Sequence, residues 1–107
     1  MATRKKLTEI LEPKQGRAVV VCTAKRGVFF GYLQLDEAPA KVVLTKARNC
    51  PYWSADVKGV MGLAAKGPTA SCRIGPAAPD ATLWEITGIL SCSPEAVAAW
   101  EAAPWKI

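Results

Sequence analysis

The sequence predicts a β-rich α+β fold, in which a small antiparallel sheet or a partly open barrel carries one C-terminal helix. Apolar, β-branched segments at residues 18–22 and 83–92 indicate strands. A helix start follows the second segment at Ser93. The length of 107 residues suits one domain, and the 50% hydrophobic content is typical of a globular protein. We therefore expect a basic N-terminal lead-in over residues 1–16 and a single globular domain over residues 17–107.

The strongest hairpin signal lies near the start of this domain. Residues 18–22 form a continuous apolar run, which indicates a strand buried on both faces. Residues 25–27 read Lys-Arg-Gly and predict a turn, because glycine readily adopts the positive φ that tight turns need. Residues 28–35 predict the second strand, in which Gly31 indicates a β-bulge or the close approach of another backbone. The Phe29-Phe30 pair places one ring on each face of that strand, so both faces must be covered.

The middle of the chain is less regular. Residues 41–48 alternate in part and predict a third strand, and Pro51 then interrupts regular pairing. Residues 57–65 are apolar but contain two glycines, and we expect a strand there. Residues 71–75 predict a short strand, and the prolines of residues 75–80 predict a rigid loop.

The C-terminal third has the clearest local signals. Residues 83–92 predict one strand with alternating faces. Ser93 is a good N-cap, Pro94 suits the first helical position, and Glu95 complements the helix dipole. Pro104 should end this helix after roughly nine residues.

The net charge of +5 is unevenly distributed. Residues 1–27 contribute +5, residues 28–75 contribute +3, and residues 76–107 contribute −3. A basic surface attracts phosphate groups, nucleic acid or acidic proteins, although a charge of this size also simply keeps a small protein soluble. No apolar run approaches the roughly 20 residues of a membrane span, and no signal-peptide pattern precedes the domain. We therefore expect a cytoplasmic protein.

Several functional classes lack their sequence signatures. The chain contains no histidine, so a Ser-His-Asp or Cys-His site cannot form within one chain. Its glycines match neither the phosphate-loop nor the dinucleotide-binding pattern. The four cysteines are widely spaced and lack the close pairs of zinc sites, which favours buried thiols; they are Cys22, Cys50, Cys72 and Cys92. We expect no catalytic residues, no cofactor and no metal.

Residues 46–54 carry more chemistry than a scaffold needs. They include Arg48, Asn49, Tyr52 and Trp53. Aromatic rings beside cations can stack on a base while the cations hold phosphate, and the same residue types are enriched in protein-binding hot spots. Alternatively, the two rings only cover the end of a β core.

Two further segments are candidate anion-binding elements. Residues 66–76 combine glycine-containing turns with hydroxyl groups and Arg73, so they could form an anion-binding nest or an ordinary turn. Lys25 and Arg26 lie at the predicted hairpin tip, where exposed cations contact phosphate or are only solvated.

Six blocks of the sequence follow one another in a distinctive order: residues 26–32, 47–54, 67–68, 72–76, 92–97 and 100–105. Together they resemble a family of small phage and prophage proteins that is carried as a domain of unknown function. The resemblance covers about residues 17–105, and no residue roles come with it. It implies a phage-encoded binding protein that acts in the host cytoplasm against a host system such as antiviral defence.

The leading hypothesis is therefore a non-enzymatic binding protein for an anionic ligand such as a nucleotide signal. Tyr52 or Trp53 would stack on the base, and Arg48 and Arg73 would pair with phosphate. We expect a homo-oligomer, because an interface supplies concavity that a small chain lacks. The alternatives are a nucleic-acid-binding accessory protein, a protein-only inhibitor of a host complex or virion component, and a cysteine- or metal-dependent enzyme.

Overall fold

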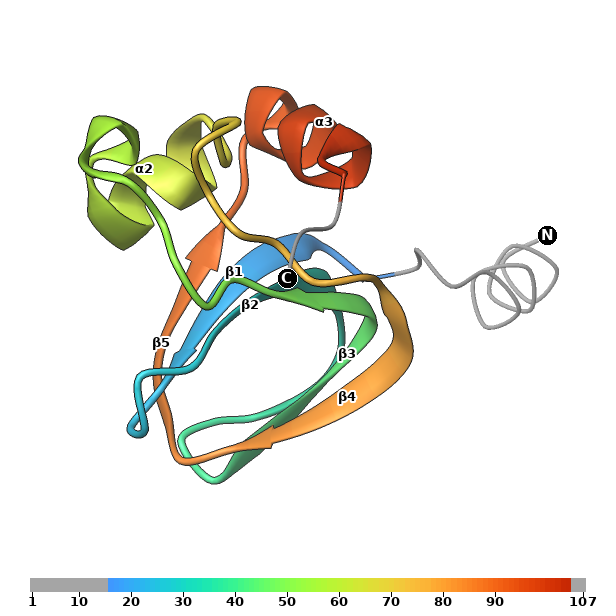
Figure 1. The fold of residues 1–107 in the computed structure, drawn as a ribbon. Coiled ribbons are helices and arrows are strands. Elements are labelled where there is room, and N and C mark those ends of the chain that lie inside the picture. Colours follow the sequence, from blue (N-terminus) through green and yellow to red (C-terminus); the bar gives the residue numbers. More distant parts are fainter. Residues whose placement is uncertain (1–15, 105–107) are drawn as a thin grey trace, which may run out of the picture.

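An antiparallel sheet of five strands forms the body of the computed structural model, which describes residues 16–104 (Figure 1). Its strand order is β4-β3-β2-β1-β5, and the sheet is not closed. The strands are β1 (Ala18–Thr23), β2 (Val28–Glu37), β3 (Lys41–Asn49), β4 (Ala78–Trp84) and β5 (Ile86–Ser91). A 3₁₀ helix and two α-helices complete the fold: η1 (Ala55–Val57), α2 (Gly59–Ala65) and α3 (Pro94–Ala102). The predicted β-rich α+β class is confirmed, with α2 as a helix that the sequence did not lead us to expect.

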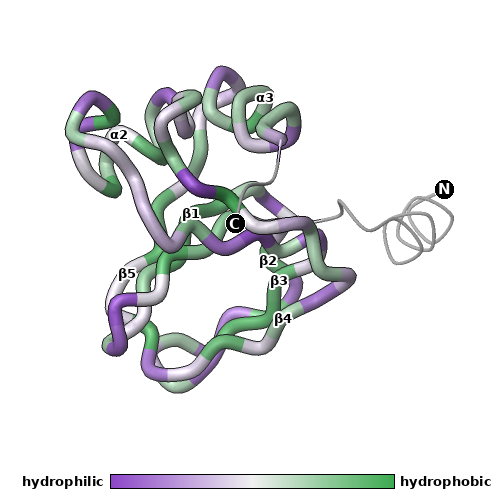
Figure 2. The backbone as a smooth tube through the Cα atoms, in the orientation of Figure 1, coloured by the Kyte–Doolittle hydropathy of each residue, from purple (hydrophilic) through white to green (hydrophobic). Residues whose placement is uncertain are grey.

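The predicted first hairpin is confirmed. β1 pairs with β2 on one side and with β5 on the other, so it lies in the interior of the sheet. Val19, Val20 and Val21 are completely buried, because their side chains alternate between two covered faces. Figure 2 shows this pattern as hydrophobic strands that end in a hydrophilic hairpin tip.

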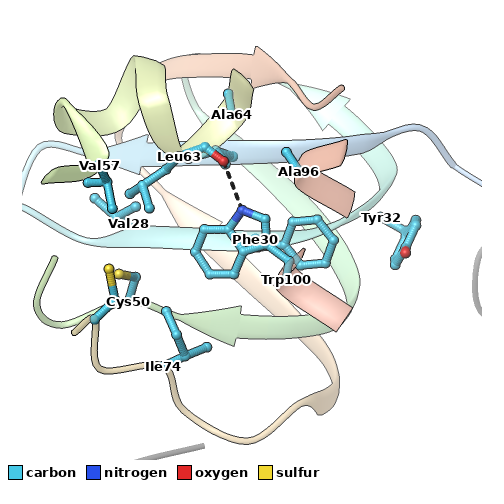
Figure 3. Close-up of a cluster of buried hydrophobic side chains, with 12 residues drawn as sticks. Val28, Phe30, Tyr32, Cys50, Val57, Leu63, Ala64, Ile74, Ala96 and Trp100 are labelled. Atoms are coloured by element: carbon cyan, nitrogen blue, oxygen red, sulfur yellow. Dashed lines mark hydrogen bonds between the residues drawn. The ribbon is translucent and has the colours of Figure 1, made fainter. Parts of the chain in front are cut away.

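Apolar side chains form two separate cores, one on each face of the sheet. The inner core lies on the concave face and takes residues from all five strands, including Val21, Leu44 and Leu83. The helix-side core lies under α2 and α3 and includes Phe30 and Trp100 (Figure 3). Phe29 packs against the inner core and Phe30 belongs to the helix-side core, so helices and curvature cover the two rings.

A single residue, Glu85, connects the two edge strands. The expectation of one strand over residues 83–92 is wrong, because the chain turns at Glu85, whose φ is 56°. The backbone of Glu85 is held from both sides: its carbonyl accepts from Ala24 N (2.9 Å), and its N–H donates to Ala40 O (3.2 Å). β4 and β5 lie at opposite edges of the sheet, so this connection requires the sheet to curl until the two edges meet at one corner.

Gly31 lies where β2 and β3 approach closely, as predicted. A Cβ at this position would lie 2.8 Å from Leu44 Cβ and 3.1 Å from the Thr45 carbonyl oxygen. The register shifts at the same point, because Phe30 pairs with Arg48 whereas Tyr32 pairs with Thr45. β3 therefore carries one extra residue here, and Lys46, with a φ of 50°, lies at this bulge.

The strand expected over residues 57–65 is a helix instead. α2 buries Leu63 and Ala64, and its C-terminal carbonyls find partners outside the helix. Ser93 N donates to Ala64 O (3.0 Å), and Ser93 Oγ donates to Ala65 O (2.5 Å). Tertiary partners thus stabilise a short helix that its glycines disfavour.

Two smaller expectations also need correction. Residues 71–75 form no strand; Arg73 makes an isolated antiparallel bridge with Tyr52. The rigid loop expected over residues 75–80 ends early, because β4 begins at Ala78. Pro79 is tolerated there because β4 is an edge strand.

The C-terminal helix is confirmed. Ser93 Oγ accepts a hydrogen bond from Ala96 N at 3.0 Å, and Pro94 and Glu95 occupy the first turn. Helices in the described part of the chain are too short or too polar to cross a membrane. The lead-in expected over residues 1–16 falls almost entirely outside the described residues.

Candidate functional site

A pocket of about 270 Å³ lies where β2 and β3 meet the end of α3. Three elements and the segment before β4 contribute to it, and its lining residues are Phe30, Tyr32, Lys46, Arg48, Ala77 and Glu101. We call it the Arg48 pocket. Its volume lies just below the roughly 300–1,000 Å³ of pockets that enclose a drug-sized ligand, so it suits a small ligand or the head group of a larger one.

Arg48 is buried in the wall of this pocket, with 7% of its surface exposed. Its Nε donates to the Gly75 carbonyl oxygen (2.8 Å), and one Nη donates to the Trp100 carbonyl oxygen (2.6 Å). Trp100 lies in the last turn of α3, where backbone carbonyls attract a cation. These bonds fix the plane of the guanidinium and tie β3 to α3 and to the segment before β4.

Within residues 16–104, an ion pair joins Lys41 and Glu37. No carboxylate in the same range lies within 4.0 Å of the Arg48 guanidinium. Burial accordingly lowers the pKa of Arg48. A buried charge is costly unless it is paired, and two neutral carbonyls compensate it only in part. Arg48 is therefore a preorganised cation without a carboxylate partner in the part of the chain that the structure describes.

The bulge at Lys46 directs Arg48 into the pocket. Leu44 and Ala47 both belong to the inner core, although residues three apart on a regular strand point to opposite faces. The extra residue at Lys46 shifts the alternation, so Arg48 points to the helix side rather than into the inner core. Lys46 itself is exposed and lines the same pocket.

Aromatic rings and one acid complete the pocket. Phe30 stacks on Trp100, with ring centroids 5.1 Å apart and an interplanar angle of 6° (Figure 3). The Tyr32 hydroxyl donates a hydrogen bond to the Glu101 carboxylate. Burial, then this hydrogen bond and the charge of Glu101, raise the pKa of Tyr32, so Tyr32 stays protonated and remains a donor.

The two candidate segments at residues 46–54 and 66–76 lie side by side. Arg73 N donates to Tyr52 O (2.9 Å), and Gly75 N donates to Asn49 O (2.9 Å). The paired Tyr52 and Arg73 are both exposed, and directly opposed residues have Cβ atoms about 4.5–5.5 Å apart. They form a surface pair, and neither belongs to the lining of the Arg48 pocket.

The other predicted site residues are dispersed. Asn49 is exposed, and its side-chain oxygen lies against Gly75, where a Cβ would be only 2.2 Å away. Trp53 is partly buried and packs against the helix-side core, whereas Tyr52 is 51% exposed. Lys25 and Arg26 are exposed at the β1–β2 tip, on the side of the sheet away from the helices (Figure 1).

The cysteines are free thiols. Burial raises the pKa of Cys50 to about 12, with a further contribution from Cys72, and burial raises the pKa of Cys92 to about 11. Thiols with such values are poor nucleophiles near neutral pH. Residues 16–104 contain no cluster of three histidine, cysteine or acidic side chains that could hold a metal ion.

Four pocket residues lie outside the candidate segments that the sequence indicated, namely Phe30, Tyr32, Ala77 and Glu101. Tyr32 and Glu101 are 69 positions apart, and no local pattern indicates that they meet. Lys46 lies in a segment that we singled out, but only the bulge shows that it lines the pocket with Arg48.

A family model described as Domain of unknown function (DUF6948) matches residues 16–100. Neither the curated proteins nor the solved structures contain a match to the chain.

Proposed function

Because the chain belongs to the family of the domain of unknown function DUF6948, we propose a function from the geometry: it is a non-enzymatic protein that binds a small phosphate-bearing ligand in the Arg48 pocket. One observation carries the proposal. A buried guanidinium, already oriented by Gly75 and Trp100, faces a pocket and lacks a carboxylate within the described residues. An anionic ligand would supply the missing charge.

Lys46 adds a second cation to the same pocket, while Phe30 and Tyr32 add aromatic surface. Planar guanidinium groups recognise phosphate with two parallel hydrogen bonds, and a lysine adds a mobile point charge. This combination favours a phosphate ester with an apolar or ring-shaped portion over a bare ion. A nucleotide signal fits that chemistry.

The biological role that we propose rests on the resemblance to small phage proteins. A phage-encoded protein that binds a nucleotide signal in the host cytoplasm would withdraw that signal from a host defence system. Binding alone suffices for this role, so no catalytic group is needed. The expected homo-oligomer stays a prediction, which native mass spectrometry measures together with any co-purified ligand.

The test compares two lysines that are both exposed but differ in position. We expect Lys46→Met to weaken binding of adenosine monophosphate at least tenfold in calorimetric titration, because it removes one of two pocket cations. Lys25→Met removes the same charge at the hairpin tip and should change binding less than twofold. In the wild type, ligand at 100 times its Kd should stabilise the fold by about 2.7 kcal/mol.

Arg48→Met is the more direct variant, but it also removes two structural hydrogen bonds. It is informative only where circular dichroism shows a native fold, and Lys46→Met keeps the proposal testable where it does not. Equal weakening by Lys46→Met and Lys25→Met would indicate nonspecific charge attraction and refute the pocket as the site.

A second candidate function rests on the exposed Tyr52–Arg73 pair. An aromatic ring beside a guanidinium suits stacking on unpaired bases, as in a nucleic-acid-binding accessory protein. This function predicts salt-dependent binding of single-stranded DNA that Tyr52→Ala abolishes and Lys46→Met weakens only slightly. A stable host protein captured without either ligand would favour a protein-only inhibitor.

A further inference from the structure

Within residues 16–104, the two helices cover only part of the helix-side face of the sheet. α2 contacts β1 and β5, and Figure 1 shows α2 and α3 together above β1, with most of β4 away from them. In the part of the chain that the structure describes, the helix-side core takes no residue from β3 or β4. The helix-side surface of β3, β4 and the end of β2 is therefore a candidate interaction surface.

The strand register arranges this surface in two rows that run across three strands. Val42, Leu44 and Leu83 belong to the inner core, so the residues that alternate with them point to the helix side. Residues directly opposite each other in a sheet share one face. We call six such residues the outer strip: Glu37, Lys41 and Trp84 in one row, and Leu35, Val43 and Thr82 in the other.

We propose that the outer strip is the contact surface of a symmetric dimer, in which a second copy of this chain packs on the same strip. The inference goes beyond the proposed function and does not depend on it.

Apolar side chains are exposed on the outer strip. Trp84 is 60% exposed and Leu35 is 37% exposed, so the strip holds two of the four large apolar side chains that are exposed in the described range. Val43 pairs with Leu35 and is only partly buried. Contiguous exposed apolar surface is typical of a contact site, and tryptophan is enriched among the residues that dominate interface energies.

The charged groups of the outer strip are held by their neighbours. Lys41 Nζ lies 3.9 Å from Glu37 Oε1 and 5.4 Å from the centroid of the Trp84 ring. The three side chains form one connected row, so less side-chain freedom is lost when a partner binds. The strip carries a single cation, whereas a nucleic-acid backbone requires several, and its two charges are of opposite sign.

One two-fold axis makes the outer strip complementary to itself. An axis that runs parallel to the strands, between β2 and β3, places each residue of β2 opposite its β3 partner in the second copy. Glu37 then faces Lys41 of the second copy, and Leu35 faces Val43 of the second copy. Unlike charges and apolar side chains therefore meet across the same axis, in two aligned sheets about 10 Å apart.

The first test measures the dimer and the contribution of Trp84. Six residues a side are fewer than the roughly 20–30 of a standard interface, so the dimer should be weak. Sedimentation velocity of the full chain, from about 5 µM to 1 mM and without added ligand, should show dimer at the upper concentrations. Trp84→Glu should raise the dissociation constant of the dimer at least tenfold. Met61→Glu is the matched control, because Met61 is exposed on α2 outside the strip, and it should change this constant less than twofold.

The second test exchanges the charges. Glu37→Lys and Lys41→Glu each place like charges opposite one another, so each variant should form its own dimer at least fivefold more weakly. An equimolar mixture of the two variants restores unlike pairs, and the mixed dimer should form within twofold of the wild type.

Two results would overturn the inference. A wild type that stays monomeric at 1 mM would point to a different partner for the outer strip. A mixture of the two charge variants that associates no better than either variant alone would exclude the proposed axis. Neither result bears on the Arg48 pocket, because the proposed function is measured separately by ligand titration.

Discussion

Trp100 is the residue whose replacement should test the helix-side core most sharply. It is completely buried, stacks on Phe30, and donates its indole N–H to the Leu63 carbonyl oxygen at 3.0 Å (Figure 3). Leu63 lies in the last turn of α2, where carbonyls lack partners within the helix. Trp100→Phe keeps an aromatic ring but removes this donor.

The expected destabilisation has two parts. A buried carbonyl that loses its hydrogen bond costs about 1–3 kcal/mol. The smaller ring leaves a void that the surrounding side chains fill only in part, which costs about 1 kcal/mol more. A total loss of about 3 kcal/mol is a large share of the roughly 5–15 kcal/mol that stabilise a domain, and it should lower the Tm by about 15 °C.

Trp84→Phe is the matched control, since Trp84 is 60% exposed and should change stability by less than about 0.5 kcal/mol. The assay is urea unfolding followed by far-UV circular dichroism, which reads secondary structure rather than tryptophan emission. A Trp100→Phe variant that loses no more stability than Trp84→Phe would refute the proposed link between α3 and α2.

Two further predictions concern the helix junction and the thiols. Ser93→Ala removes the N-cap hydrogen bond of α3 and the hydrogen bond to Ala65 O, so it should lower the free energy of unfolding by about 1–2 kcal/mol. Ser71→Ala, at an exposed position, should leave stability unchanged. Equal urea midpoints for the two variants would contradict this role of Ser93. The free energy of unfolding should stay constant from pH 6 to 8 and fall between pH 9 and 11. In the unfolded chain the thiols lose their protons near the ordinary pKa of 9.0, whereas in the fold burial raises the pKa of Cys50 to about 12 and that of Cys92 to about 11, so deprotonation favours the unfolded chain. Urea midpoints measured across this range check the sign, and a rising midpoint would contradict it.

The elements that the sequence predicted correctly have local causes. The run at residues 18–22 is apolar at every position, and only burial on both faces suits such a run. The Ser93-Pro94-Glu95 start encodes its own cap and first turn. Such signals need no information from the rest of the chain.

The elements that escaped prediction depend on tertiary contacts. α2 has two glycines in seven residues, and its last carbonyls are satisfied by Ser93 and Trp100 from a distant segment. Glu85 adopts a positive φ that glutamate rarely takes, because backbone groups of Ala24 and Ala40 hold it. Composition alone indicates neither.

The site shows the same division. Residue types marked residues 46–54 and 66–76 as separate candidate binding segments, and the fold brings these segments together. The single extra residue at Lys46 decides that Arg48 faces the helices, and no strand pattern reveals a bulge of this kind. Whether Asn49, Tyr52, Trp53 and Arg73 act on the same ligand as Arg48 stays a prediction.

The pairing of β1 with β5 has a consequence for biosynthesis. Val20 pairs with Leu90, so the second edge of β1, the first of the described strands, is covered only by β5, the last of them. A nascent chain that ends before residue 86 exposes an apolar β1 edge, which is a template for unwanted association. Both edges of β1 can therefore be covered only after the segment that contains β5 has left the ribosome.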